Sequence, residues 1–108
     1  MAKLDKQVYD IVVATVADYR RMQGIIEKGK APREQLALFV KRVNAIDNAL
    51  IAICKGERHE LRESLMVDIA ERRGYDRSLS RIYLTSRKSF DKRKAEAVEL
   101  IAKFLWLI

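Results

Sequence analysis

The chain has 108 residues, which is enough for one hydrophobic core and too few for two. Apolar residues make up 49% of it and charged residues 34%, a composition typical of a folded globular protein rather than a disordered one. One proline and four glycines leave few chain breakers. We therefore predict an all-α fold, a small helical domain of about five helices over residues 1–108.

The sequence also limits chemistry and location. A single cysteine, Cys54, excludes an intrachain disulfide and a cysteine-rich metal site, and its apolar helical surroundings predict a buried free thiol. No segment reaches the ~18 apolar residues of a membrane span. The first ten residues lack a signal-peptide pattern. These features predict a protein of the reducing cytoplasm without a membrane partner.

The first predicted helix covers residues 3–28 and ends at Gly29. Arg20 and Arg21 lie opposite its apolar stripe and are expected to face solvent. The stripe recurs at helical spacing and consists of Leu4, Val8, Ile11, Val12, Val16, Tyr19, Met22 and Ile26.

Pro32 suits the first turn of a second helix, which Gly56 ends. This helix carries a heptad seam of two and a half repeats. The seam favours an antiparallel hairpin with the first helix, and a coiled-coil dimer is the alternative. Residues 1–56 would then be a helical hairpin and residues 57–108 a helix-turn-helix-like half. The seam consists of Leu36, Phe39, Val43, Ile46, Leu50 and Ile53.

A third helix is predicted over residues 57–73, with Gly74 as its C-terminal cap. Its inner face carries Leu61, Leu65, Met66 and Ile69. His59 is the only histidine and lies among charged residues, so we expect a solvated side chain rather than a ligand or a catalyst.

Two helices are predicted after Gly74. Asp76 or Ser78 can cap a short helix of roughly two turns through residues 79–83. Thr85 or Ser86 can cap the next helix, which meets no breaker before the last residue. One side of that long helix carries Phe90, Ala97, Ile101, Phe104 and Ile108.

Residues 72–94, here called the basic stretch, hold nine Lys or Arg against two acids, a local charge of +7. The whole chain also carries +7, so the remaining residues sum to zero. Positive charge concentrated in one place is the pattern expected of a nucleic-acid contact surface.

A short helix, a tight turn and a basic helix form the outline of a helix-turn-helix. With Phe90 buried and ~100° per residue, Lys88 and Lys92 point away from the core. Residues near the start of the second helix are candidates for base contacts, and earlier arginines for phosphate contacts. The candidate DNA-binding residues are Arg72, Arg73, Arg77, Arg81, Ser86, Arg87, Lys88, Ser89, Lys92 and Arg93.

The basic stretch has two other interpretations. Many helices carry lysine and arginine on a face that simply contacts water, and an acidic protein could also bind such a surface. The concentration of charge in one predicted motif, with few acids nearby, favours nucleic acid over both.

The last five residues, FLWLI, are apolar on every side of the predicted helix. Phe104, Leu105 and Ile108 continue the buried side, whereas Trp106 falls opposite. Apolar residues all round a terminal turn favour contacts on two sides. We slightly favour a homodimer contact through Trp106 over a helix end packed within its own domain.

The sequence contains no catalytic set: no histidine beside a nucleophile, no metal-ligand cluster and no phosphate-binding glycine loop. We therefore expect a protein that is not an enzyme and needs no cofactor.

IDNAL at residues 46–50, and YLTSRKSFDKRKAEAVELIAKFL at residues 83–105, give the chain a family resemblance over residues 44–105. It resembles the ArpU and RinA group of phage transcriptional regulators, whose C-terminal half is similar to DNA-binding region four of sigma factors. The matching residues are Ser86, Phe90, Lys92, Arg93, Lys94, Ala95 and Ala97. The resemblance implies control of transcription.

The sequence therefore predicts a phage-type regulator that reads double-stranded DNA with a basic C-terminal helix. One alternative is an oligomeric phage assembly or packaging protein similar to a small terminase subunit. Another is a basic adaptor or inhibitor that binds an acidic protein. Target site, activation or repression, DNA or RNA, and oligomeric state stay open.

Overall fold

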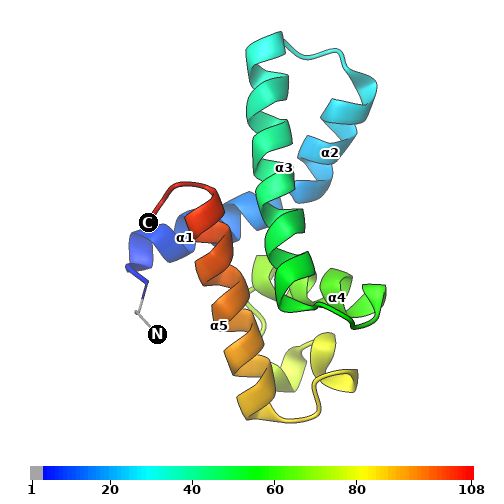
Figure 1. The fold of residues 1–108 in the computed structure, drawn as a ribbon, viewed down its shortest axis with the longest axis vertical. Coiled ribbons are helices and arrows are strands. Elements are labelled where there is room, and N and C mark those ends of the chain that lie inside the picture. The colour runs from blue at the N-terminus through cyan, green and yellow to red at the C-terminus, as the bar shows by residue number, and fades with distance from the viewer. Residues whose placement is uncertain (1–3) are drawn as a thin grey trace.

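The computed structural model describes residues 4–108, and all the regular structure in this range is helical (Figure 1). Five α-helices and two 3-10 turns account for it, so the predicted all-α class is confirmed. No helix in the described range is long and apolar enough to cross a membrane. The elements are α1 (Lys6–Ala17), α2 (Tyr19–Lys28), α3 (Arg33–Ile53), α4 (His59–Ala70), η1 (Tyr75–Arg77), η2 (Ser80–Ile82) and α5 (Arg87–Phe104).

The predicted single helix over residues 3–28 is wrong, because the chain turns at Asp18 (Figure 1). Lys3 lies outside the described residues. The Asp18 backbone ends α1, while its carboxylate accepts two hydrogen bonds, of 2.6 and 2.7 Å, from the Arg21 guanidinium. The Thr15 hydroxyl also donates to the Ile11 carbonyl at 2.7 Å, a bond that tends to bend helices. Local polar contacts therefore divide one apolar stripe between two helices.

The helices α2 and α3 form an antiparallel hairpin, so only the second part of the predicted first helix pairs with α3, and α1 packs on α4 and α5 instead. Gly29 ends α2 with a positive φ of 64°, a conformation that glycine adopts at little cost. Met22, Phe39 and Val43 form a small apolar cluster inside the hairpin. Because four seam residues are buried within the chain, the seam is not free to form a coiled-coil dimer.

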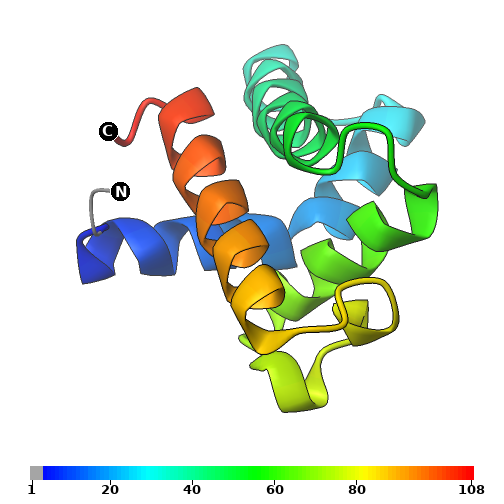
Figure 2. The same cartoon turned by 60° about the horizontal axis from the view of Figure 1, so that its bottom comes forward.

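The main core joins both halves of the chain. Helix α1 packs on α4 and α5, and Figure 2 shows it crossing behind α5. Cys54 is buried in this core, which confirms the predicted buried thiol, and burial raises its pKa. The other buried members come from α1, α3, α4 and α5 and, for Leu84, from the loop before α5: Val12, Val13, Val16, Ile46, Ala49, Leu50, Leu61, Leu65, Ile69, Leu84, Phe90, Ala97, Val98, Ile101 and Ala102.

Helix α4 is shorter than predicted, and Gly74 does not cap it. Instead Arg72 adopts a left-handed φ of 54°. The following amide, of Arg73, donates back to the Asp68 carbonyl at 2.8 Å, which closes the helix end. His59 is exposed on this helix, as predicted, and contacts Arg62 and Glu63.

The predicted two-turn helix over residues 79–83 is also wrong, because two separate 3-10 turns, η1 and η2, take its place. Neither Asp76 nor Ser78 caps it. The buried Asp68 carboxylate of α4 accepts hydrogen bonds from the Leu79 and Ser80 amides, at 2.8 and 3.1 Å, and from the Ser80 hydroxyl at 2.7 Å. A tertiary contact therefore sets the conformation of this loop.

Helix α5 ends at Phe104 and does not reach the last residue. Trp106 has a left-handed φ of 62°, and the Leu107 amide donates back to the Ala102 carbonyl at 2.9 Å. The reversal packs Leu105 and Leu107 against the core and leaves Trp106 and Ile108 exposed. We call residues 105–108 the C-terminal hook.

Replacing Asp68 with alanine should lower the free energy of unfolding by about 2–4 kcal/mol, because two backbone amides and a hydroxyl lose a charged acceptor in the interior. Urea unfolding followed by circular dichroism measures this. Asp91→Ala is the matched control, since Asp91 is exposed and should change stability by less than about 0.5 kcal/mol. Equal losses in both variants would contradict the anchoring role.

The Tyr19 hydroxyl donates to Asp47 at 2.7 Å, and burial together with this bond raises the pKa of Tyr19 to about 12. The unfolded chain, with a tyrosine pKa of about 10, loses this proton first as pH rises. The free energy of unfolding should therefore not depend on Tyr19 ionisation below pH ~10. It should fall as pH rises from ~10 to ~12, because the unfolded chain loses the Tyr19 proton first. Urea unfolding of the parent and of Tyr19→Phe across this range tests it, and an identical fall in both would refute it.

Candidate nucleic-acid interface

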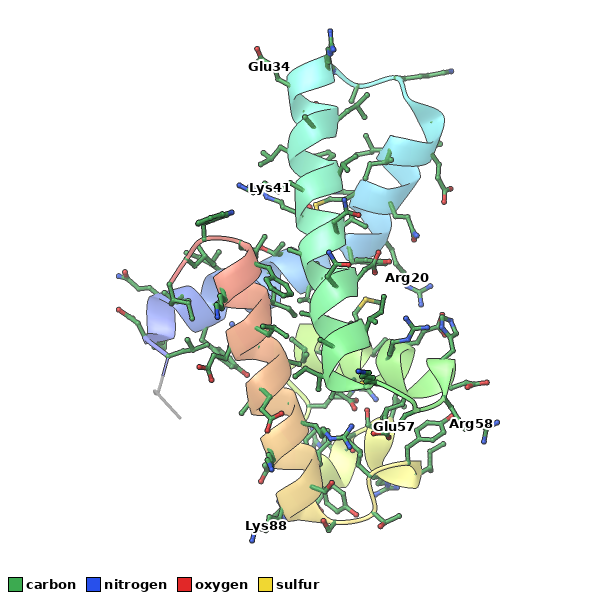
Figure 3. The ribbon with its side chains drawn as sticks, in the orientation of Figure 1. Arg20, Glu34, Lys41, Glu57, Arg58 and Lys88 are labelled. Carbon is green, nitrogen blue, oxygen red and sulfur yellow. The ribbon has the colours of Figure 1, made fainter. Side chains whose placement is uncertain are left out.

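The N-terminal end of α5 projects at one end of the molecule, beside the two 3-10 turns (Figure 2). Ser86 begins the helix, as predicted, and its hydroxyl accepts a hydrogen bond from the Ser89 amide at 3.1 Å. Lys88 lies in the first turn and points away from the protein (Figure 3). The free amides and dipole of a helix start add positive potential here.

Tyr75 fixes the loop before α5 against the helix. Its hydroxyl donates to the Thr85 carbonyl at 2.8 Å, and its ring lies 5.9 Å from that of Phe90. The Arg87 guanidinium lies over the Tyr75 ring, 5.6 Å from its centre, and binds Asp76 at 3.0 Å. The Asp76 contact raises the pKa of Arg87. The start of α5 is therefore held in one orientation.

Two predicted DNA-binding arginines instead connect parts of the domain. Arg72 donates to Asp10 of α1 at 2.9 Å and lies 5.5 Å from the centre of the Tyr9 ring. Arg93 forms an ion pair with Glu57 and donates to the Ile53 carbonyl at 3.2 Å, which ties α5 to the end of α3. Both guanidinium groups have partners within the fold.

Lys94 and Arg73 also contact the protein. The Lys94 ammonium is half-buried beside the Phe90 ring and donates to the Arg73 carbonyl at 2.9 Å. Burial lowers the pKa of Lys94. The Arg73 side chain binds Glu71 at 3.1 Å and the Arg77 carbonyl at 3.4 Å. These bases stabilise the segment that connects α4 to α5.

Five exposed bases remain around the start of α5, and we call them the open basic set: Arg77, Arg81, Arg87, Lys88 and Lys92. Within residues 4–108, Arg77 and Lys88 side chains have no ion pair or hydrogen bond. Lys92 reaches Glu96 only at 4.0 Å, and Arg81 binds one backbone carbonyl. The Arg87–Asp76 pair is exposed to solvent and therefore weak, so a phosphate can compete for Arg87.

Sequence reasoning missed the role of Asp68. Its position three residues after Leu65 and next to Ile69 places a carboxylate on the inner face of α4. A charged residue on an apolar stripe was the available signal.

The described part of the chain has no group of three His, Cys, Asp or Glu side chains placed to hold a metal ion.

Substituting a base that has partners within the fold should lower stability more than substituting a base of the open basic set. Arg93→Gln should lower the free energy of unfolding by about 1 kcal/mol, because it loses an ion pair and a hydrogen bond to α3. Lys88→Gln should change it by less than about 0.5 kcal/mol. Urea unfolding of both variants provides the measurement. A larger loss for Lys88→Gln than for Arg93→Gln would contradict this division.

Comparisons of this chain with protein-family models, with curated protein sequences and with solved structures found no match. The resemblance to ArpU and RinA regulators therefore rests on the residues quoted for it above. Any functional conclusion depends on the chemistry and geometry of the surface itself.

Proposed function

We propose that this protein is a DNA-binding transcriptional regulator that contacts double-stranded DNA with the N-terminal end of α5. The observation that carries the proposal is the open basic set around that end, in a chain whose other residues outside the basic stretch have no net charge. The proposed role needs no cofactor and no catalytic group. A cytoplasmic location, where DNA is accessible, belongs to the same proposal.

The shape of the surface supports entry into a groove. An α-helix with its side chains is about 10–12 Å wide, which matches the ~12 Å major groove of B-DNA. Lys88 and Lys92 are one turn apart on the exposed side of α5, and Ser89 lies between them. These three side chains are the candidates for base contacts, since lysine and serine can bond to base edges.

The bases before α5 suit a different role. Arg77 and Arg81 lie on η1 and η2, beside the start of the helix, where they would contact the phosphate backbone. Such contacts orient a protein on DNA without reading sequence. Arg87 can exchange Asp76 for a phosphate. Arg72, Arg73 and Arg93 then act indirectly, by holding the loop and α5 in place.

Fluorescence anisotropy with labelled duplexes across a salt series tests this division of roles. Lys88→Ala and Lys92→Ala should weaken a specific site more than random DNA, because base contacts discriminate. Arg77→Ala should weaken both kinds of DNA equally and lower the salt slope by about one, because one phosphate contact is lost. Fragments upstream of neighbouring genes are the first candidates for a specific site.

Lys28→Ala is the matched control, because Lys28 lies at the end of α2, far from α5's start (Figure 1). It should leave the affinity unchanged. Equal losses at both kinds of DNA for every open-set variant would refute the base-reading role. Loss of binding with Lys28→Ala alone would place the contact surface elsewhere.

A second candidate is an oligomeric assembly or packaging protein, and one observation favours it. Trp106, Ile108, Phe104 and Leu38 are large apolar side chains exposed to solvent. Ring-forming assembly proteins need such surfaces, and a ring would have a far larger mass in solution than a dimer. The third candidate, an adaptor for an acidic protein, would be favoured by failure to bind any nucleic acid at low salt.

A further inference from the structure

An apolar surface lies where the C-terminal hook meets α1 and α3. Ile11 is 47% exposed, Leu38 43%, Phe104 37% and Trp106 80%. Two adjoining hollows connect them. The apolar residues Ile11, Leu38, Leu105 and Leu107 line one hollow together with Thr15 and Arg42. Phe104 and Trp106 line the other together with Ala45, Asn44 and Asn48, and Lys41 borders both. We call this region the hook surface.

The hook surface continues a face of α3 that α5 covers only in part. Near the end of α3, the small residues Ala45 and Ala49 are buried where α5 packs alongside. Because α5 stops at Phe104, the earlier part of α3 extends past it without a neighbouring helix on that side (Figure 1). The same face carries Glu34, Leu38 and Lys41 there, and all three are exposed.

The accessible surface of the chain is large for its mass. It measures 7096 Å² at 12.5 kDa, whereas a compact monomer of this size exposes about 6,200 Å². An elongated form of 44 × 28 × 23 Å accounts for the difference, with the α2–α3 hairpin projecting from the main core.

The charges on α3 favour one kind of partner. Glu34 and Lys41 point to the same side of the helix, the side on which the hook lies (Figure 3). They are seven residues, or two turns, apart, with Leu38 between them. If a second α3 lies antiparallel across this face, each Glu34 meets the partner's Lys41, and the two Leu38 side chains pack near the twofold axis. A parallel arrangement would place like charges together.

We propose that the hook surface binds a second copy of this chain, with the two α3 helices antiparallel and Trp106 packed into the interface. A twofold contact needs a self-complementary patch, and Glu34, Leu38 and Lys41 provide one in sequence order. Aromatic residues such as Trp106 often contribute most to such contacts. The pairing involves none of the open basic set, so it does not depend on DNA binding.

The pairing also determines where the two basic surfaces lie. In each copy the start of α5 is at the opposite end of the molecule from the beginning of α3 (Figure 1). Antiparallel contact through the beginning of α3 therefore places the two α5 starts at opposite ends of the dimer. Such a dimer would connect two separate DNA segments, rather than read two adjacent half-sites as many helix-turn-helix dimers do.

Charge reversal tests the antiparallel contact. Sedimentation equilibrium without DNA, from about 1 µM to about 500 µM, should show a monomer–dimer equilibrium. Glu34→Lys and Lys41→Glu should each weaken dimerisation at least tenfold, because each creates two like-charge contacts. The double variant, with both reversals, should recover to within about threefold of the parent, because the pairs re-form with their signs exchanged.

Trp106 gives a second readout because it is the only tryptophan in the chain. Its emission should move to shorter wavelength as concentration rises and its ring leaves water. Trp106→Ala should weaken dimerisation at least tenfold, whereas the control Ile51→Ala, at a 50% exposed position on another side of α3, should leave it unchanged. Circular dichroism should show unchanged helix content in every variant.

Two outcomes would overturn the proposal. A parent chain that stays monomeric at the highest concentration excludes self-association. A double charge-reversal variant as weak as the single variants excludes the antiparallel contact. Either result would leave the DNA-binding proposal untouched, since sedimentation is measured without DNA.

Discussion

The buried carboxylate of Asp68 is the contact on which the C-terminal half depends. In place of water, it accepts hydrogen bonds from two backbone amides and one hydroxyl of the loop between α4 and α5. Burial lowers the pKa of the half-buried Lys94 ammonium, and the nearby Asp68 carboxylate opposes this lowering. An interior anion with hydrogen bonds and a nearby cation is tolerated, and removing one partner is costly. The loop therefore has one conformation, and the start of α5 has one direction.

The bases of the basic stretch fall into two structural groups that composition could not separate. Some of its bases neutralise or bond to groups of the fold, as Arg72 does with Asp10 and Arg93 with Glu57. Others, such as Arg77 and Lys88, extend into solvent from the η1 turn and the first turn of α5. Net charge measures both groups together. Only the tertiary partners show which positive charges remain available to a ligand.

Apolar periodicity predicted the all-α class and the pairing of α3 with the α2 part of the predicted first helix, and capping residues predicted the start of α5. It failed where polar contacts, rather than the spacing of apolar residues, decide the backbone conformation. The Asp18 carboxylate binds Arg21 at the break between α1 and α2. Hydrogen bonds to Asp68 hold the loop before α5, where two 3-10 turns form instead of the predicted helix. Arg72 and Trp106 adopt left-handed conformations that glycine favours, so neither helix end had its usual signal. At the site, the exposure of Lys88 and Lys92 followed from helical geometry, whereas the partners of Arg72 and Arg93 depended on residues distant in sequence.

The small cluster in the hairpin has a consequence for local stability. Met22, Phe39 and Val43 are the buried residues that hold the far part of α2 to α3, apart from the larger core around α1, α4 and α5. Segments with few buried contacts open at lower free energy than the rest of a domain. A partner bound along the beginning of α3 would stabilise this part of the chain most. Association and local order would then be thermodynamically linked, and the hairpin would be more rigid in the dimer than in the monomer.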